Sequence, residues 1–136
     1  MLKTVCYISD ARLSEPLENV KAIYKKAKEN NLKHDITGVL IFHKGNFLQV
    51  LEGMAESVDQ TYEKIRFDSR HKNIIKVINI KTEQRIFEDY SFGFTIVKSS
   101  NEFKELTEYL KWLKNADNKI ANKLIIMVEN FIRNVG

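Results

Sequence analysis

Long hydrophobic runs and cysteine are nearly absent from this chain of 136 residues. The only cysteine, Cys6, has no second thiol in the chain with which it could form an internal disulfide. The longest uninterrupted apolar run, residues 124–128, is far short of the roughly 20 residues that a membrane-spanning helix needs. The first residues also lack the plan of a signal peptide. We therefore expect no membrane partner and a reducing, cytoplasmic location.

An excess of one charge and the common catalytic motifs are missing as well. The 22 Lys and Arg residues face 18 Asp and Glu residues, and acidic residues interrupt every basic cluster. This pattern lacks the basic stripe that nucleic-acid binding usually needs. The three histidines, His34, His43 and His71, are not at metal-ligand spacing, and no P-loop, GxGxxG or GxSxG motif occurs. We expect no nucleic-acid partner, no metal site and no hydrolytic catalysis.

What the sequence does contain is the composition and length of a single globular domain. Apolar residues make up 43% of the chain and charged residues 29%, which excludes a largely disordered or fibrous chain. A length of 136 residues is near the usual size of one domain. We expect one hydrophobic core, without a linker or an internal repeat.

The spacing of the apolar residues predicts elements in the order βαββαβ, followed by one more strand and two helices. This is the order of a ferredoxin-like α+β fold. Two helices should lie on one face of the sheet, and the two C-terminal helices should cover the other. The predicted strands cover residues 4–8, 36–42, 47–51, 74–80 and 92–97; the predicted helices run from Pro16 to Asn31, from about Val58 to near Asp68, from Ser99 to Leu113 and from Ile120 to Phe131.

Polar residues stand in this pattern where apolar ones are expected. Gln49 has apolar residues on both sides, so strand alternation points its amide into a core-facing layer, where the hydroxyl of Tyr7 could meet it across the sheet. A buried amide needs hydrogen bonds, and a purely structural pair is one explanation. Asn30 and Asn31 also have a simple explanation, because asparagine often ends helices. Each feature by itself leaves structural and functional explanations open.

Taken together and in this order, these residues resemble the BLUF family, the bacterial sensors of blue light using flavin. The string Phe-Leu-Gln-Val-Leu-Glu-Gly at 47–53, with the upstream tyrosine and the paired asparagines, is the most specific part of the match. The resemblance covers roughly residues 1–97. Its other matching segments are Tyr7 to Ala11, Ile36 to Leu40, Asp68 to His71 and Arg85 to Phe87.

The resemblance implies a domain in which a flavin ring is inserted between the first two helices. It implies that Tyr7 and Gln49 form a photoactive pair, with light driving electron and proton transfer from Tyr7 through Gln49. An apolar slot with a few convergent amides suits a flat heterocycle with one hydrogen-bonding edge. The other cofactor-binding residues that it implies are Asn30 and Asn31 at the pyrimidine edge, Lys64 near the C2 carbonyl, Ile23 and Ile65 on either face of the ring, and Asp68 towards the ribityl chain, with Arg70 and His71 following Asp68 in the chain.

Three positions depart from the family pattern. Tyr90 and Phe92 stand where the family usually has tryptophan and methionine. A phenyl ring cannot accept a hydrogen bond as methionine does, which bears on signal output through the last strand. We expect Tyr90 to be an exposed or packing residue. The other hypothesis is that Tyr90 acts as an alternative electron donor. Asp35 replaces a glycine, and there we expect a change only in the local turn.

From the resemblance we expect a blue-light photoreceptor that binds FAD non-covalently and is not an enzyme, with FMN or riboflavin as alternative cofactors. Residues 1–97 would form the flavin-binding domain, and residues 98–136 a helical extension packed on the sheet. Altered hydrogen bonds would change contacts with an unidentified downstream protein. The alternatives are a ferredoxin-like interaction module without flavin and a flavin-using enzyme, for which so short a chain lacks a substrate-binding loop.

The last predicted helix bears on assembly. Its apolar residues form two adjoining stripes, which is more apolar surface than packing on one sheet face requires. One explanation is burial on two sides within the monomer, and the other is an isologous dimer through the last two helices. We expect a homodimer or a higher oligomer. The stripes consist of Ile120, Leu124, Met127, Val128 and Phe131 on one side and of Ala121, Ile125 and Ile132 on the other.

Overall fold

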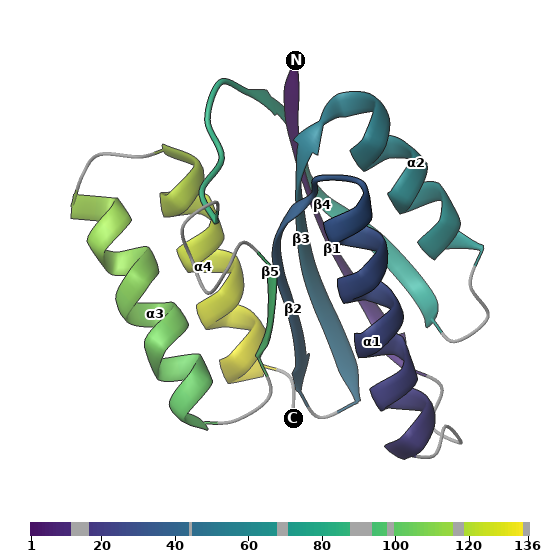
Figure 1. Ribbon diagram of the computed structural model, residues 1–136. Helices are drawn as coiled ribbons and strands as arrows, with labels where there is room; N and C mark the ends of the chain where they lie inside the picture. Colours follow the sequence, from purple (N-terminus) through teal and green to yellow (C-terminus); the bar gives the residue numbers. More distant parts are fainter. Residues whose placement is uncertain are drawn as a thin grey trace.

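A computed structural model describes residues 1–11, 17–43, 45–67, 71–87, 94–97, 100–115 and 119–134 of the chain (Figure 1). Within them, a mixed sheet has the strand order β4-β1-β3-β2-β5. The strands are β1 (Leu2–Ala11), β2 (Thr37–His43), β3 (Asn46–Met54), β4 (His71–Thr82) and β5 (Phe94–Val97). The helices are α1 (Leu17–Lys33), α2 (Ala55–Arg66), α3 (Ser100–Asn115) and α4 (Lys119–Asn134).

The strand pairing confirms the predicted ferredoxin-like α+β fold. Strand β1 lies between β4 and β3 and is antiparallel to both, and β2 is antiparallel to β3. The short additional strand β5 pairs in parallel with β2 at the edge of the sheet. This order places Tyr7 on β1 directly opposite Gln49 on β3, as cross-strand partners.

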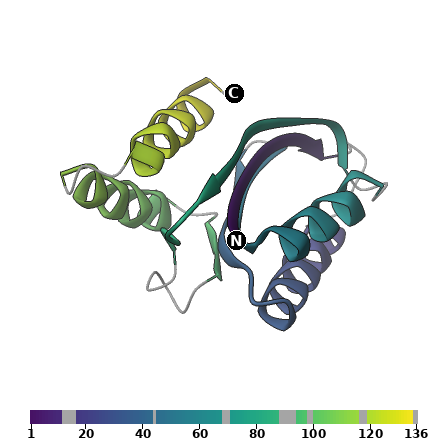
Figure 2. The same cartoon turned by 90° about the horizontal axis from the view of Figure 1, so that it is seen from above.

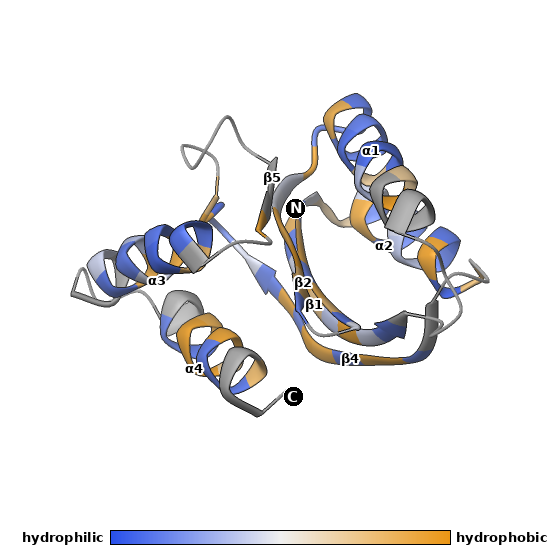
Figure 3. Ribbon diagram, turned by 90° about the horizontal axis from the view of Figure 1, so that it is seen from below, coloured by the Kyte–Doolittle hydropathy of each residue, from blue (hydrophilic) through white to orange (hydrophobic). Residues whose placement is uncertain are grey.

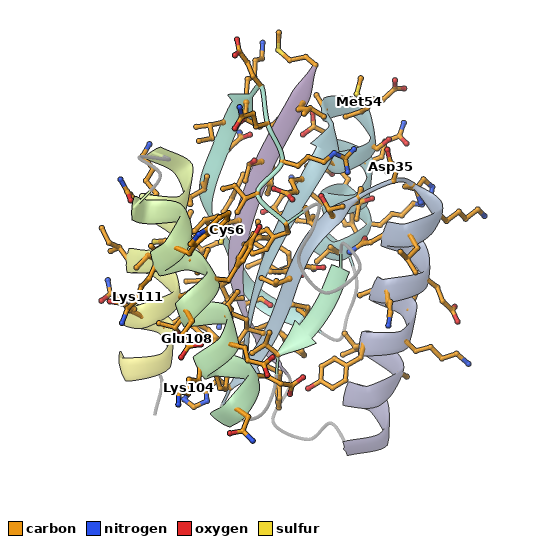
Figure 4. The ribbon with its side chains drawn as sticks, turned by 60° about the vertical axis from the view of Figure 1, so that its left-hand side comes forward. Cys6, Asp35, Met54, Lys104, Glu108 and Lys111 are labelled. Carbon is orange, nitrogen blue, oxygen red and sulfur yellow. The ribbon has the colours of Figure 1, made fainter. Side chains whose placement is uncertain are left out.

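The helices cover both faces of the sheet, as the sequence predicts. Figures 1 and 2 show α1 and α2 on one side of the sheet and α3 and α4 on the other. Alternate residues of β1 enter different cores: Val5 and Tyr7 pack with α2, whereas Cys6 packs in the cluster that contains Leu106 of α3 and Leu124 of α4. Figure 4 shows Cys6 on this second side, where burial raises the pKa of its thiol to about 12.

Three strands are longer than the sequence predicts. β1 continues to Ala11 rather than ending at Ile8, β3 covers Asn46–Met54 rather than residues 47–51, and β4 begins at His71 rather than Ile74. The reason is backbone pairing, since β1 forms register partners with β4 from Leu2 with Thr82 to Ala11 with His71, and with β3 from Leu2 with Met54 to Asp10 with Asn46. Pairing of this kind depends on main-chain groups, so the ends of such strands need no apolar side chains. His71, which precedes the predicted strand, therefore begins β4.

Helix α1 also extends beyond its predicted end. It continues past Asn31 to Lys33, because the carbonyls of Asn30 and Asn31 accept hydrogen bonds from the amides of His34 and Ile36. The paired asparagines therefore do not end the helix, which weakens their simple structural explanation. Helix α3 begins at Ser100. Its predicted start, Ser99, lies outside the described residues.

Most of the described apolar surface of α4 is buried within the single chain. Leu124, Ile125, Val128 and Phe131 are each at most 5% exposed and belong to the same core cluster as Leu106 and Leu110 of α3. Residues of both stripes are thus covered by the sheet and α3, and Figure 3 shows apolar colour along α4 and the strands. In the described part of the chain, no helix has the length and apolar character to cross a membrane.

Candidate functional site

A cavity of about 430 Å³ lies between α1, α2 and the sheet. Its lining joins residues that are far apart in sequence, because β1, β2 and β3 form its floor and the two helices form its walls. The floor contributes Tyr7, Leu40 and Gln49; α1 contributes Ile23, Lys26, Ala27, Asn30 and Asn31; and α2 with the residue after it contributes Thr61, Lys64, Ile65 and Phe67.

The floor of the cavity holds a buried hydroxyl–amide pair. Tyr7 is fully buried and Gln49 is 2% exposed, and the Gln49 Nε2 atom donates a hydrogen bond to the Tyr7 hydroxyl. The strand register brings these two side chains together, since they are cross-strand partners on the same face of β1 and β3. Tyr62 of α2 supports the phenol from behind in an edge-on contact, with ring centroids 5.9 Å apart.

Two further amides extend this pair into a chain of hydrogen bonds. Asn31, which is 1% exposed, donates from Nδ2 to Oε1 of Gln49 at 3.3 Å. Asn30 donates from its own Nδ2 to Oδ1 of Asn31 at 3.3 Å and to the hydroxyl of Thr61 at 3.3 Å. The chain therefore runs from the Thr61 hydroxyl on α2, through three amides, to the Tyr7 hydroxyl on β1.

The hydroxyl groups at the two ends allow the hydrogen bonds of this chain to be donated in either direction. An amide has a donor end and an acceptor end, whereas a hydroxyl can donate or accept. If all three amides rotate, Tyr7 donates to Gln49 and Thr61 donates to Asn30, and every bond between these five side chains is kept. Two directions with the same number of hydrogen bonds give this site two states of comparable internal bonding.

The apolar walls of the cavity face each other across the slot between the helices. Ile23 of α1 is 5% exposed and packs with Leu40 and Phe47, whereas Ile65 of α2 is half-buried and packs beside the cluster that contains Tyr7. A flat, partly apolar ligand with polar groups along one edge matches such walls above an amide floor.

The structure brings together seven of the predicted site residues and leaves three undecided. Asp68 and Arg70 lie outside the described residues, and of His71 only the backbone in β4 is described. Tyr90 and Phe92, the departures from the family pattern, also lie outside the described residues. The residues that line one cavity are Tyr7, Ile23, Asn30, Asn31, Gln49, Lys64 and Ile65. Their roles towards a cofactor stay predictions.

Five lining residues are not among those predicted from the sequence. Helical spacing was the signal that could have found three of them, because Lys26 precedes Asn30, Ala27 follows Ile23 and Thr61 precedes Ile65, each by four residues, which places each pair on one helix face. Nothing local in the sequence marks Leu40 or Phe67 as lining residues.

A second polar cluster lies on the opposite face of β3, three residues beyond Gln49. The carboxylate of Glu52 is fully buried and accepts hydrogen bonds from the hydroxyl of Thr37 and from the backbone amides of Ile86 and Phe87, at 2.7, 2.7 and 2.6 Å. Burial raises the pKa of this carboxyl above its ordinary value, and the donated bonds and the nearby Arg85 act in the opposite direction. The cluster fastens residues 85–87 to the sheet.

Asp35 joins this cluster from the turn between α1 and β2 (Figure 4). Its backbone has a φ of 55°, the left-handed region that favours glycine. Arg85 bonds both its carbonyl oxygen, at 2.8 Å, and its carboxylate, at 3.1 Å. The effect of an aspartate here therefore extends beyond the local turn, contrary to the expectation from the sequence.

The described residues contain no group of three or more histidine, cysteine or acidic side chains arranged to hold a metal ion. His34 contacts the Asn30 carbonyl through Nδ1 at 2.8 Å, and His43 packs against the ring of Phe103 at 5.4 Å between centroids. Both histidines thus have packing and hydrogen-bonding partners within the fold.

Comparisons with known proteins agree with this geometry. The family described as "Sensors of blue-light using FAD" matches residues 2–93. The Blue light- and temperature-regulated antirepressor BluF of Escherichia coli K12 is 37% identical over 78 residues, which are 57% of this chain and 19% of that protein. Photoactivated adenylate cyclase subunit beta of Euglena longa is 34% identical over 101 residues, 74% of this chain and 11% of that protein. The chain thus spans a fifth or less of these relatives.

Solved structures show the same arrangement. The dark-state structure of BlrB, a BLUF protein, matches with a TM-score of 0.67 and 28% identity, over 82% of this chain and 83% of that one. The likeness thus extends over most of both chains.

Proposed function

This chain belongs to the BLUF family of blue-light sensors that use flavin, and from that premise we propose that its cavity binds the flavin ring and that Tyr7 and Gln49 are its photoactive pair. The observation that supports this most directly is the buried bond between these two side chains at the floor of an apolar slot. When bound, a flavin absorbs blue light and accepts an electron and a proton.

The residues of the cavity fit such a group. Asn30, Asn31 and Gln49 supply amide donors and acceptors for the polar edge of the ring, and Ile23 and Ile65 supply apolar surfaces on either side. Lys64 would interact with the C2 carbonyl edge. We propose FAD as the cofactor, in keeping with the family description, with FMN and riboflavin as the alternatives.

Tyr7 and Gln49 would act together after excitation. Among the described lining residues, Tyr7 is the only tyrosine, and tryptophan and cysteine are absent, so its phenol is the electron donor that the cavity offers. Its hydroxyl accepts a hydrogen bond from Gln49 Nε2, and the released proton would pass to Gln49 Oε1 once the amide is in its reversed orientation. When the proton returns, the Gln49 amide would be rotated or in its other tautomer, and its hydrogen bonds would differ from those before excitation. Reversal of the amide chain would keep these new hydrogen bonds in place.

The absorption spectrum of the purified protein tests this proposal. We expect flavin bands and a small, reversible red shift of those bands under blue light, because a rearranged Gln49 strengthens a hydrogen bond to the C4 carbonyl. Excess FAD should be added before measurement to exclude poor loading during expression. A protein that stays colourless after this addition would favour the alternative, an interaction module that has lost its flavin.

We propose that the output is a change in protein contacts and that the chain has no catalytic activity of its own. Residues 1–97 would form the flavin-binding domain and residues 98–136 the extension that receives the change. Leu48 and Val50, the neighbours of Gln49, enter the core cluster of α3 and α4, and the hydroxyl of Tyr109 on α3 donates to the carbonyl of Ile86. These contacts support a path from the photoactive strand to α3.

We predict a homodimer or higher oligomer whose association, or whose affinity for a downstream protein, changes on illumination. The apolar side chains available for such contacts on the outer helices include Trp112 of α3, 65% exposed, and Ile126 of α4, 59% exposed. Light scattering coupled to size exclusion, in darkness and under blue light at several concentrations, measures this. A strict monomer under both conditions would rule out self-association and leave a different partner protein.

Replacement of the paired asparagines should weaken flavin binding unequally. Asn31→Ala should cost about 1 to 3 kcal/mol of binding free energy, because it leaves a desolvated polar group of the ring unpaired and releases Gln49. Asn30→Ala should cost less, since its side chain is partly exposed. Titration by flavin fluorescence measures both, with Asn79→Ala on the exposed face of β4 as the control. Equal affinities for wild type and the double variant would show that other residues bind this edge.

A further inference from the structure

The described lining of the cavity carries charge of one sign only. It contains two ammonium groups, on Lys26 and Lys64, and no carboxylate, although the whole chain is nearly balanced with 22 basic and 18 acidic residues. The acidic side chains closest in sequence, Glu29 and Glu63, do not line the cavity, and Glu63 is paired with Arg66 at 3.2 Å. Among the described residues, neither lining lysine has an ion-pair partner. The cavity therefore suits a ligand with a negative charge.

A flavin ring does not account for both lysines, because the neutral ring is only polar along one edge. The amides of Asn30, Asn31 and Gln49 serve that edge, and the proposed contact of Lys64 with the C2 carbonyl completes it. Lys26 is then the charged lining residue without a role. It lies four residues before Asn30 on α1, about 6 Å along the helix axis from the amide end of the slot.

Lys26 also lies where the cavity meets solvent. Its side chain is exposed, so its stem lines the wall while its ammonium group reaches the mouth. Phe67, just after α2, lines the cavity too and is 77% exposed, which marks this side of the lining as the opening. A substituent on the ring that leaves the slot on this side would pass the ammonium group.

We propose that Lys26 forms a phosphate subsite at the mouth of the cavity, so that this chain selects phosphorylated flavins, FMN and FAD, over riboflavin. The inference rests on the proposed function, since it assigns a role within the same cavity. An exposed ammonium–phosphate pair gains modest Coulomb energy that salt screens, so the selectivity should be about fivefold to tenfold at low ionic strength and should decline as salt is added.

Flavin-free protein titrated with riboflavin, FMN and FAD tests this assignment by fluorescence quenching at low and high ionic strength. In Lys26→Met, which keeps an apolar stem without the charge, the ratio of FMN to riboflavin affinity should fall about fivefold to tenfold, towards one. Lys25→Met and Lys28→Met are matched controls, because both residues are exposed on the same helix and neither lines the cavity. Both controls should keep the wild-type ratio.

The outcomes separate this inference from the proposed function. Riboflavin and FMN binding equally well to wild type, or an unchanged ratio in Lys26→Met, would overturn the phosphate subsite and leave the photoreceptor proposal intact. A ratio lost equally in the control variants would also overturn it, because that result would reflect the general charge of α1. If none of the three flavins binds, the proposed function itself fails.

Discussion

Tyr7→Phe and Gln49→Leu are each expected to abolish the light-induced red shift while leaving flavin bound. Tyr7→Phe removes the hydroxyl that accepts the bond from Gln49, together with the readily oxidised phenol, and keeps the ring that fills the core. Gln49→Leu removes the amide at the centre of the hydrogen-bond chain. Difference spectra recorded before and after blue light measure the shift, and the dark spectrum reports the bound flavin.

Tyr62→Phe is the matched control for the first substitution. It makes the same chemical change in a ring 5.9 Å from Tyr7 that does not line the cavity. The control should keep a red shift of wild-type size. A wild-type shift in Tyr7→Phe or in Gln49→Leu would remove that residue from the mechanism, and loss of the shift in all three variants would point to packing around the phenol instead.

Gly38→Ala should destabilise the fold by more than about 3 kcal/mol, because the new methyl group has no space and the backbone cannot yield. Gly38 lies on β2 with a φ of 149°, and an added Cβ would meet the carbonyl oxygen of Val50 on β3 at 1.9 Å. Both atoms belong to paired strands, with β5 on the other side, so relief of this contact would break strand pairing. Urea unfolding followed by circular dichroism measures the loss.

Gly45→Ala separates this close approach from the general cost of a positive φ. Gly45 has a φ of 83° in the hairpin turn, and no heavy atom lies within 4 Å of an added Cβ. Its replacement should cost only about 1 kcal/mol, the usual penalty for a left-handed alanine. Equal losses of stability in the two variants would contradict the role given to the contact with Val50. A Gly38→Ala protein recovered only as unfolded material would agree with it.

The sequence by itself determined the features that repeat with a regular period. Alternation along β1 and β3 placed Tyr7 and Gln49 on one face, because successive strand residues point to opposite sides whatever lies around them. Helical spacing likewise identified the buried side of α4, where Leu124 and Val128 recur. The family resemblance rested on the order of a few polar residues in these elements, and the ferredoxin-like order of elements followed from the same periods.

Only the tertiary structure decided what depends on residues distant in sequence. Glu52 follows the apolar run of residues 47–51 and shows no local sign of burial, but donors from Ile86 and Phe87 make a buried carboxylate tolerable there. Thr61 became the end of the amide chain because α2 packs beside Asn30, and the full length of β4 came from backbone pairing with β1. Such contacts are set by how elements pack, and no local period encodes the partner that satisfies a buried polar group.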